Sequence, residues 1–190
     1  MAGNEYAFLT EWKVDASPEE AYDVIADGES LARWWPSVYL EVKTLEAGDA
    51  NGIGRVTALC TKGFLPYTLR WRFRITEARR GERIALDAEV DFVGRGIWTF
   101  TASQGKTDVA FDWRLRADKP MLRALSFLLK PVFSANHRWA MARGEESLRL
   151  ELLRRRAITP EERARIPPPP GPTFPHDRRT RALMNASARR

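Results

Sequence analysis

The chain has 190 residues, 44% of them hydrophobic, and a formal net charge of +6. This length and hydrophobic content suffice for one domain with a full core, and they exclude intrinsic disorder of the main body. Residues 157–190 hold seven arginines against three acidic residues, a charge of +4, so residues 1–156 carry only +2. A nearly neutral domain does not indicate a nucleic-acid-binding face, and we expect no specific nucleic-acid partner.

Cysteine content and hydropathy bear on disulfide and metal chemistry and on where the protein is located. Cys60 is the only cysteine, which excludes an intramolecular disulfide and a thiolate metal cluster. The first residues, "MAGNEYAFLTEWKVD", lack the apolar run of a signal peptide. The longest strongly apolar run, 124–129, is far shorter than the roughly 20 residues that span a bilayer. We predict a cytoplasmic protein without a transmembrane segment.

The chain begins with a predicted strand and two short helices. Residues 5–14 alternate near period two, which predicts a strand. In "DASPEEAYDVIAD", Ser17 is the expected N-cap and Pro18 the first helical residue, followed by an apolar stripe at helical spacing. A second short helix, "ESLARWW", is expected to end at Pro36 because proline cannot continue it.

A run of strands follows, most of them joined by short turns. In "YTLRWRFRIT" (67–76) the apolar residues share one face, and Arg70, Arg72 and Arg74 lie on the other. This alternation is typical of an antiparallel sheet with one covered face, and we expect the arginines to pair with acidic residues of neighbouring strands. The predicted strands are 38–46, 53–62, 67–78, 83–92, 95–103 and 107–117.

The last predicted element of the domain is a helix over residues 120–156, with a kink or a new start at Pro131. From Ala157 the chain is rich in proline and arginine, so we predict an extended and then disordered tail over 157–190. This tail is either a solvated extension or a docking segment for a protein partner. The order of elements predicts an α+β fold in which one helix crosses a strongly curved antiparallel sheet and leaves a pocket beneath it.

Two stretches, "VDASPEEAYDVIAD" and "LARWWPSV", together with the terminal helix from about residue 131, resemble the START-like, or SRPBCC, superfamily. This superfamily of helix-grip proteins includes polyketide cyclases/dehydrases and lipid-transport domains, and the resemblance covers about residues 5–155. It implies a domain over 1–156 with a curved seven-stranded antiparallel sheet, two short helices after the first strand, and a long C-terminal helix over the concave face. It also implies an apolar cavity between helix and sheet for lipids, polyketides or other bulky ligands.

Candidate site residues come from the inward stripe of the long helix and from tryptophans. His137 is either a core histidine, a hydrogen-bond donor to a ligand, or a general base. Gly144 indicates close approach of a ligand or of the sheet, because glycine in a helix costs about 1 kcal/mol relative to alanine. The resemblance places Trp34 and Trp35 near one end of the cavity, one of them expected in the core and the other at the pocket or its entrance, and core filling is the alternative for each tryptophan. The predicted ligand-binding residues are Trp35, Trp71, Trp98, Trp113, Phe133, His137, Met141 and Gly144.

These residues favour binding of a hydrophobic or aromatic small molecule, lipid- or polyketide-like, in the helix–sheet cavity. One alternative is a polyketide cyclase/dehydrase-like enzyme with His137 as acid or base. A second is an interaction module that docks through its basic, proline-rich tail. No spacing of His, Cys or carboxylates indicates a metal site and no glycine-rich loop precedes a helix, so we expect neither a metal nor a cofactor.

Overall fold

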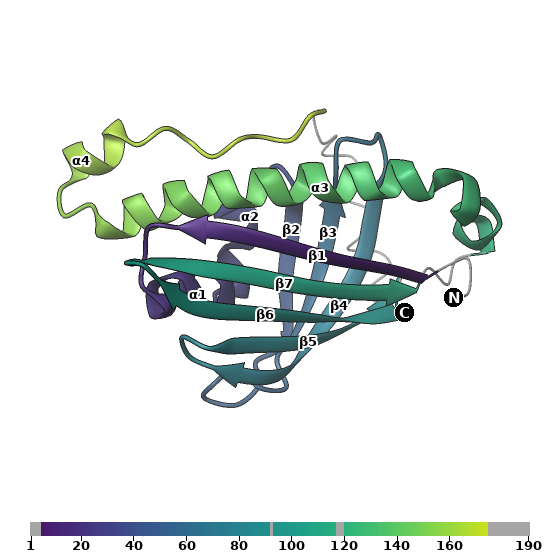
Figure 1. Ribbon diagram of the computed structural model, residues 1–190, viewed down its shortest axis with the longest axis horizontal. Coiled ribbons are helices and arrows are strands. Elements are labelled where there is room, and N and C mark those ends of the chain that lie inside the picture. The colour runs from purple at the N-terminus through teal and green to yellow at the C-terminus, as the bar shows by residue number, and fades with distance from the viewer. Residues whose placement is uncertain (1–4, 92, 117–119, 175–190) are drawn as a thin grey trace.

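A computed structural model describes residues 5–91, 93–116 and 120–174 (Figure 1). Seven strands form one antiparallel sheet in the order β1-β7-β6-β5-β4-β3-β2, so the first strand closes against the last and β1 and β2 are the edges. The sheet curves around the long helix, as expected for a helix-grip fold. The strands are β1 (Glu5–Val14), β2 (Tyr39–Glu46), β3 (Val56–Lys62), β4 (Thr68–Arg79), β5 (Arg83–Val90), β6 (Val93–Ser103) and β7 (Lys106–Arg116).

The helices also follow the predicted order. A 3-10 turn (Gly28–Ser30) connects α1 to α2, and α2 ends just before Pro36. The helices are α1 (Pro18–Ala26), α2 (Leu31–Trp34), α3 (Pro120–Arg156) and α4 (Pro160–Arg165). The predicted fold class is therefore confirmed: a curved seven-stranded antiparallel sheet, two short helices after the first strand, and a long C-terminal helix.

The start of α1 shows how local sequence sets an element. The Ser17 hydroxyl accepts a hydrogen bond from the Glu20 backbone amide at 3.2 Å, and the Glu20 carboxylate accepts one from the Ser17 amide at 2.8 Å. This reciprocal pair satisfies two amides that the first helical turn leaves without partners. The predicted N-cap is confirmed.

Three predicted strand boundaries differ from the structure by two or more residues. The strand predicted from residue 95 begins at Val93, and in the other two cases the backbone explains the difference. The strand predicted from residue 53 begins at Val56 because Gly52 and Gly54, with φ of 82° and 84°, form a turn. The strand predicted to reach residue 92 ends at Val90, whose φ of 95° is incompatible with a continuing strand.

The alternation predicted for β4 places its arginines on the outer face of the sheet. Arg72 lies opposite Glu89 of β5 and its Nε is 2.8 Å from the Glu89 carboxylate, whereas Arg74 reaches Glu46 at 2.9 Å. These contacts confirm the expected pairing with carboxylates of other strands for Arg72 and Arg74.

Helix α3 covers the concave face and continues through Pro131 as one helix. Its N-terminal turns are angled away from its long straight part (Figure 1), in keeping with the kink that an internal proline predicts. Its inner side completes the core, where the Leu148 side chain is fully buried. No helix in the described part of the chain combines the length and the hydrophobicity of a membrane span.

The tail departs from the predicted extended conformation at residues 160–165. Residues 160–165 form α4, because Thr159 and Glu162 make a capping box like that of Ser17 and Glu20, with Pro160 at the first helical position. The chain after α4 runs back beside α3 (Figure 1). Arg154 donates a hydrogen bond to the Pro167 carbonyl, and the Thr173 hydroxyl lies 3.5 Å from the Gly63 carbonyl oxygen. The prediction for residues 175–190 lies outside the described residues.

Candidate functional site: a cavity between the sheet and the long helix

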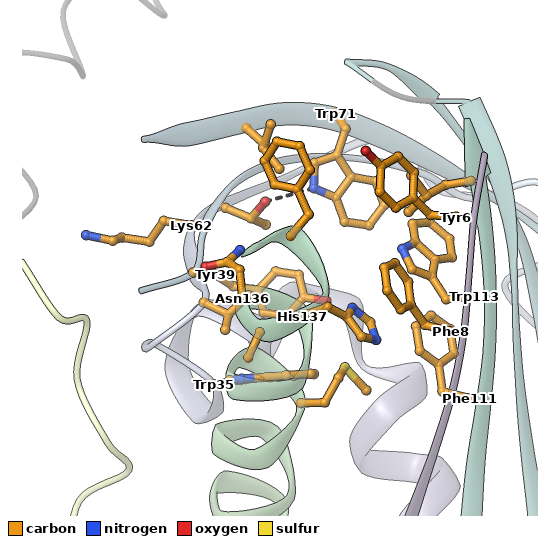
Figure 2. Close-up of a pocket in the computed structure, with 18 of the residues that line it drawn as sticks. Tyr6, Phe8, Trp35, Tyr39, Lys62, Trp71, Phe111, Trp113, Asn136 and His137 are labelled. Carbon is orange, nitrogen blue, oxygen red and sulfur yellow. Dashed lines mark hydrogen bonds between the residues drawn. The ribbon is translucent and has the colours of Figure 1, made fainter. Parts of the chain in front are cut away.

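A cavity of about 200 Å³ lies between the concave face of the sheet and α3 (Figure 2). Its wall is mainly aromatic and aliphatic, with a few polar groups. The lining residues are Tyr6, Phe8, Trp35, Val38, Tyr39, Thr61, Lys62, Gly63, Tyr67, Leu69, Trp71, Phe111, Trp113, Leu115, Phe133, Asn136, His137, Ala140 and Met141.

The sheet supplies its part of the wall by simple alternation. Side chains two residues apart on a strand point to the same face, so β7 contributes Phe111, Trp113 and Leu115 together. Trp71 of β4 packs its ring against Trp113 at 5.8 Å between centroids. Its indole Nε1 donates to the Thr61 hydroxyl at 3.0 Å, which fixes the orientation of the ring (Figure 2).

Helix α3 supplies the opposite wall through residues spaced three and four apart. Phe133, His137 and Met141 lie four residues apart, and Asn136 and Ala140 fill the same stripe. Met141 is 6% exposed, so this stripe is buried at its C-terminal end. The helix therefore closes the cavity over the sheet.

His137 lies between β1 and the cavity. Its ring stacks on Phe8 with centroids 4.2 Å apart, and its Nε2 is 3.4 Å from the Thr10 hydroxyl. Burial lowers the pKa of His137 to about 4, with a smaller contribution from the positive charge of Arg138. The imidazole is thus neutral near pH 7, and its hydrogen-bond partner is a hydroxyl rather than a carboxylate.

Two further polar residues distinguish the inner part of the cavity from its rim. Burial raises the pKa of Tyr39 above its ordinary value, so the phenol stays protonated. At the rim, the Lys62 side chain lines the cavity with its stem, while its ammonium nitrogen lies 4.9 Å from the centre of the Phe174 ring. Figure 2 shows that nitrogen directed away from the other lining side chains.

Six of the eight residues predicted from the sequence line this cavity, and two do not. Trp98 lies behind the wall, stacked on Phe111 with centroids 4.0 Å apart, and faces a second cavity of about 60 Å³. Gly144 contacts Trp35 instead, since a Cβ at this position would lie 2.3 Å from the indole Cζ2. The six that line the cavity are Trp35, Trp71, Trp113, Phe133, His137 and Met141.

Several lining residues were missed. Tyr6 and Phe8 were detectable, because they alternate on the first predicted strand with the same period as the chosen tryptophans. Tyr67 was detectable too, because it shares the predicted apolar face of Trp71 in the stretch 67–76, whereas Tyr39 is the first residue of β2, where the alternation pattern is too short to assign a face. Among the described residues, no group of three His, Cys, Asp or Glu side chains could hold a metal ion.

Comparison with known proteins agrees with this geometry. The model of the family "Polyketide cyclase / dehydrase and lipid transport" matches residues 14–142, which is more than half of the chain. The chain belongs to this family. No curated protein matches the chain.

Solved structures share the fold. A protein from Thermus thermophilus superposes with a TM-score of 0.65 at 17% identity, over 80% of this chain and 100% of that one. The Zhui aromatase/cyclase from Streptomyces sp. R1128 gives a TM-score of 0.62 at 17% identity, over 81% of this chain and 97% of that one. The di-domain ARO/CYC StfQ from the steffimycin biosynthetic pathway gives 0.57 at 15% identity, over 74% of this chain and 49% of that one. At these identities the likeness shows the helix-grip fold.

Proposed function

We propose that this protein binds a hydrophobic or aromatic small molecule, lipid- or polyketide-like, in the cavity between α3 and the sheet. The observation that carries the proposal is the cavity itself, about 200 Å³ with a mainly aromatic wall. An apolar cavity of about 150 Å³ holds benzene, so the present one suits a compact ring system of one or two fused rings. Family membership supports the same conclusion, because the family is described as one of cyclases, dehydrases and lipid transport.

Naphthalene is a suitable first probe, since it has two fused rings and no polar group. Binding should quench or shift the tryptophan fluorescence, because Trp35, Trp71 and Trp113 line the cavity. It should also raise the melting temperature in a saturable way, with about 2.7 kcal/mol of stabilisation at a ligand concentration 100 times the Kd.

Met141 provides a matched pair of variants for this test. Met141→Trp fills the cavity and should abolish the naphthalene response, whereas Met141→Leu conserves volume and should retain it. A wild-type protein that shows neither a thermal shift nor a fluorescence change with naphthalene or with larger apolar compounds would refute the proposal.

The enzymatic alternative assigns His137 as acid or base in a cyclase/dehydrase-like reaction. His137 lines the cavity, and two structures that share the fold are described as aromatase/cyclase proteins. Its pKa of about 4 makes it a weak base near pH 7, because a general base works best with a pKa close to the operating pH. A histidine that is neutral and weakly basic near pH 7 suits ligand binding better than proton transfer. If the protein turned over a polyketide-like substrate and His137→Gln abolished that turnover, the enzymatic alternative would be favoured instead.

The tail alternative is tested by deletion. Residues 166–174 contact the domain through Arg154 and Gly63, so the described part of the tail is packed on its own chain. We expect a variant without residues 157–190 to keep naphthalene binding. A protein partner captured by the full chain and lost in this variant would support a docking role for the tail.

A further inference from the structure

The cavity offers an incoming ligand hydrogen bonds but no opposite charge. Among the described residues that line it, Lys62 is the one that carries a charge near pH 7, and its ammonium group lies over the Phe174 ring outside the cavity. Asp, Glu and Arg are absent from the described lining. His137 adds no charge to the lining near pH 7, because burial lowers its pKa to about 4.

A ligand that carries its own charge would therefore lose its water shell without gaining a counter-ion. An isolated carboxylate transferred from water into an apolar site is strongly disfavoured, and in practice it takes up a proton or stays outside. An uncharged ring compound meets no such penalty, and it gains from stacking and edge contacts with the aromatic wall.

Tyr39 is the polar group best placed to recognise such a compound. Its side chain borders both the 200 Å³ cavity and the smaller 60 Å³ cavity, so it stands at the inner end of the ligand space. Its ring packs edge-on against Trp35 with centroids 5.1 Å apart, which limits its movement. Its hydroxyl makes no hydrogen bond with another described residue, and Figure 2 shows the side chain projecting among the lining residues.

We propose that the cavity selects uncharged one- or two-ring compounds that carry a carbonyl or similar acceptor, and that the Tyr39 hydroxyl donates a hydrogen bond to this acceptor. This inference rests on the proposed binding function and names its ligand class. Tyr39 is then a specificity-determining residue, and the carboxylate of the same ring system is the disfavoured ligand.

Three probes with one ring skeleton test the proposal at pH 7: naphthalene, 2-acetylnaphthalene and 2-naphthoate. Their Kd values are measured by tryptophan fluorescence on the full chain and on Tyr39→Phe. The ketone should bind roughly three- to tenfold more tightly than naphthalene, the gain expected from one neutral hydrogen bond. Tyr39→Phe should remove this gain, so that in this variant the ketone and naphthalene bind with similar Kd values. The carboxylate should bind at least roughly tenfold more weakly than the ketone.

The possible outcomes separate the two proposals. If none of the three probes binds, the proposed binding function fails and this inference fails with it. If naphthalene binds but 2-naphthoate binds as tightly as the ketone, the charge selectivity is overturned and the binding function stands. Loss of that carboxylate affinity in Lys62→Met would then identify an ammonium group that turns inward. A ketone affinity unchanged in Tyr39→Phe would overturn the role of Tyr39.

Discussion

Gly144→Ala tests whether the helix glycine is required by the contact of α3 with Trp35. In an ordinary helix this change stabilises by about 1 kcal/mol, because alanine has the higher helix propensity. Here the new methyl group would lie 2.3 Å from Cζ2, 2.6 Å from Cη2 and 2.7 Å from Cε2 of the Trp35 indole. Carbon atoms in contact are normally about 3.5–4.0 Å apart, so helix and indole must separate by roughly 1 Å or more.

The surroundings of Trp35 determine the size of the effect. Its ring is 3% exposed and packs on Trp12, Trp34 and Tyr39, with centroids 5.6, 5.4 and 5.1 Å away. Overpacking of such a core costs about 1–3 kcal/mol, and the required displacement places this case near the upper value. After subtraction of the propensity gain of about 1 kcal/mol, the expected net loss of unfolding free energy is about 2 kcal/mol.

Urea denaturation of wild type and Gly144→Ala measures this loss, with an unchanged m-value as the sign that the denatured state is the same. Ala142→Gly, at an exposed position on the same helix, is the control for helix propensity alone and should cost about 1 kcal/mol. In a Trp35→Phe background the clashing atoms are gone, so Gly144→Ala should become neutral or stabilising. A stabilising effect in the wild type, or an equal loss in both backgrounds, would refute the reasoning.

Three further predictions concern single residues. NMR titration should show His137 with a pKa of about 4. The unfolded chain binds this proton near pH 6.5 and the folded chain only near pH 4, so the unfolding free energy should decrease by roughly 3 kcal/mol as the pH falls from 6.5 to 4. His137→Gln should remove this decrease, and His176→Gln should keep it. Ser17→Ala should cost about 1 kcal/mol in thermal or urea unfolding, and an unchanged stability would contradict the capping contact. Glu151→Gln should cost about 1–3 kcal/mol, because the 2% exposed carboxylate accepts two hydrogen bonds from Arg33; a loss no larger than that of an exposed glutamate would argue against this.

Much of the fold was predictable because its signals are local. The capping box at Ser17 depends on residues three apart, and the face of β4 follows from alternation along ten residues. The stripe of Phe133, His137 and Met141 likewise follows from helical spacing. Errors arose where the local pattern was ambiguous, as at Gly54 and Val90, whose positive φ values end or delay a strand.

The candidate site was less predictable, because a tryptophan on a strand shows which face it occupies but not what lies above it. Trp98 and Trp113 are on the inner face of neighbouring strands, yet Phe111 is stacked over Trp98 and separates it from the larger cavity. Tyr39 could not be predicted as a site residue, because it is the first residue of β2. Only the tertiary structure shows that it borders both cavities.

The sequence by itself therefore determined the order of elements, the inward face of the long helix, and the family resemblance that the family model confirms. Only the tertiary structure decided that Gly144 approaches Trp35, that His137 is neutral against Phe8 and Thr10, and that space remains beneath Met141. The physical reason is range: helices and strands follow from neighbours along the chain, whereas a cavity depends on how far a curved sheet stands from the helix that covers it.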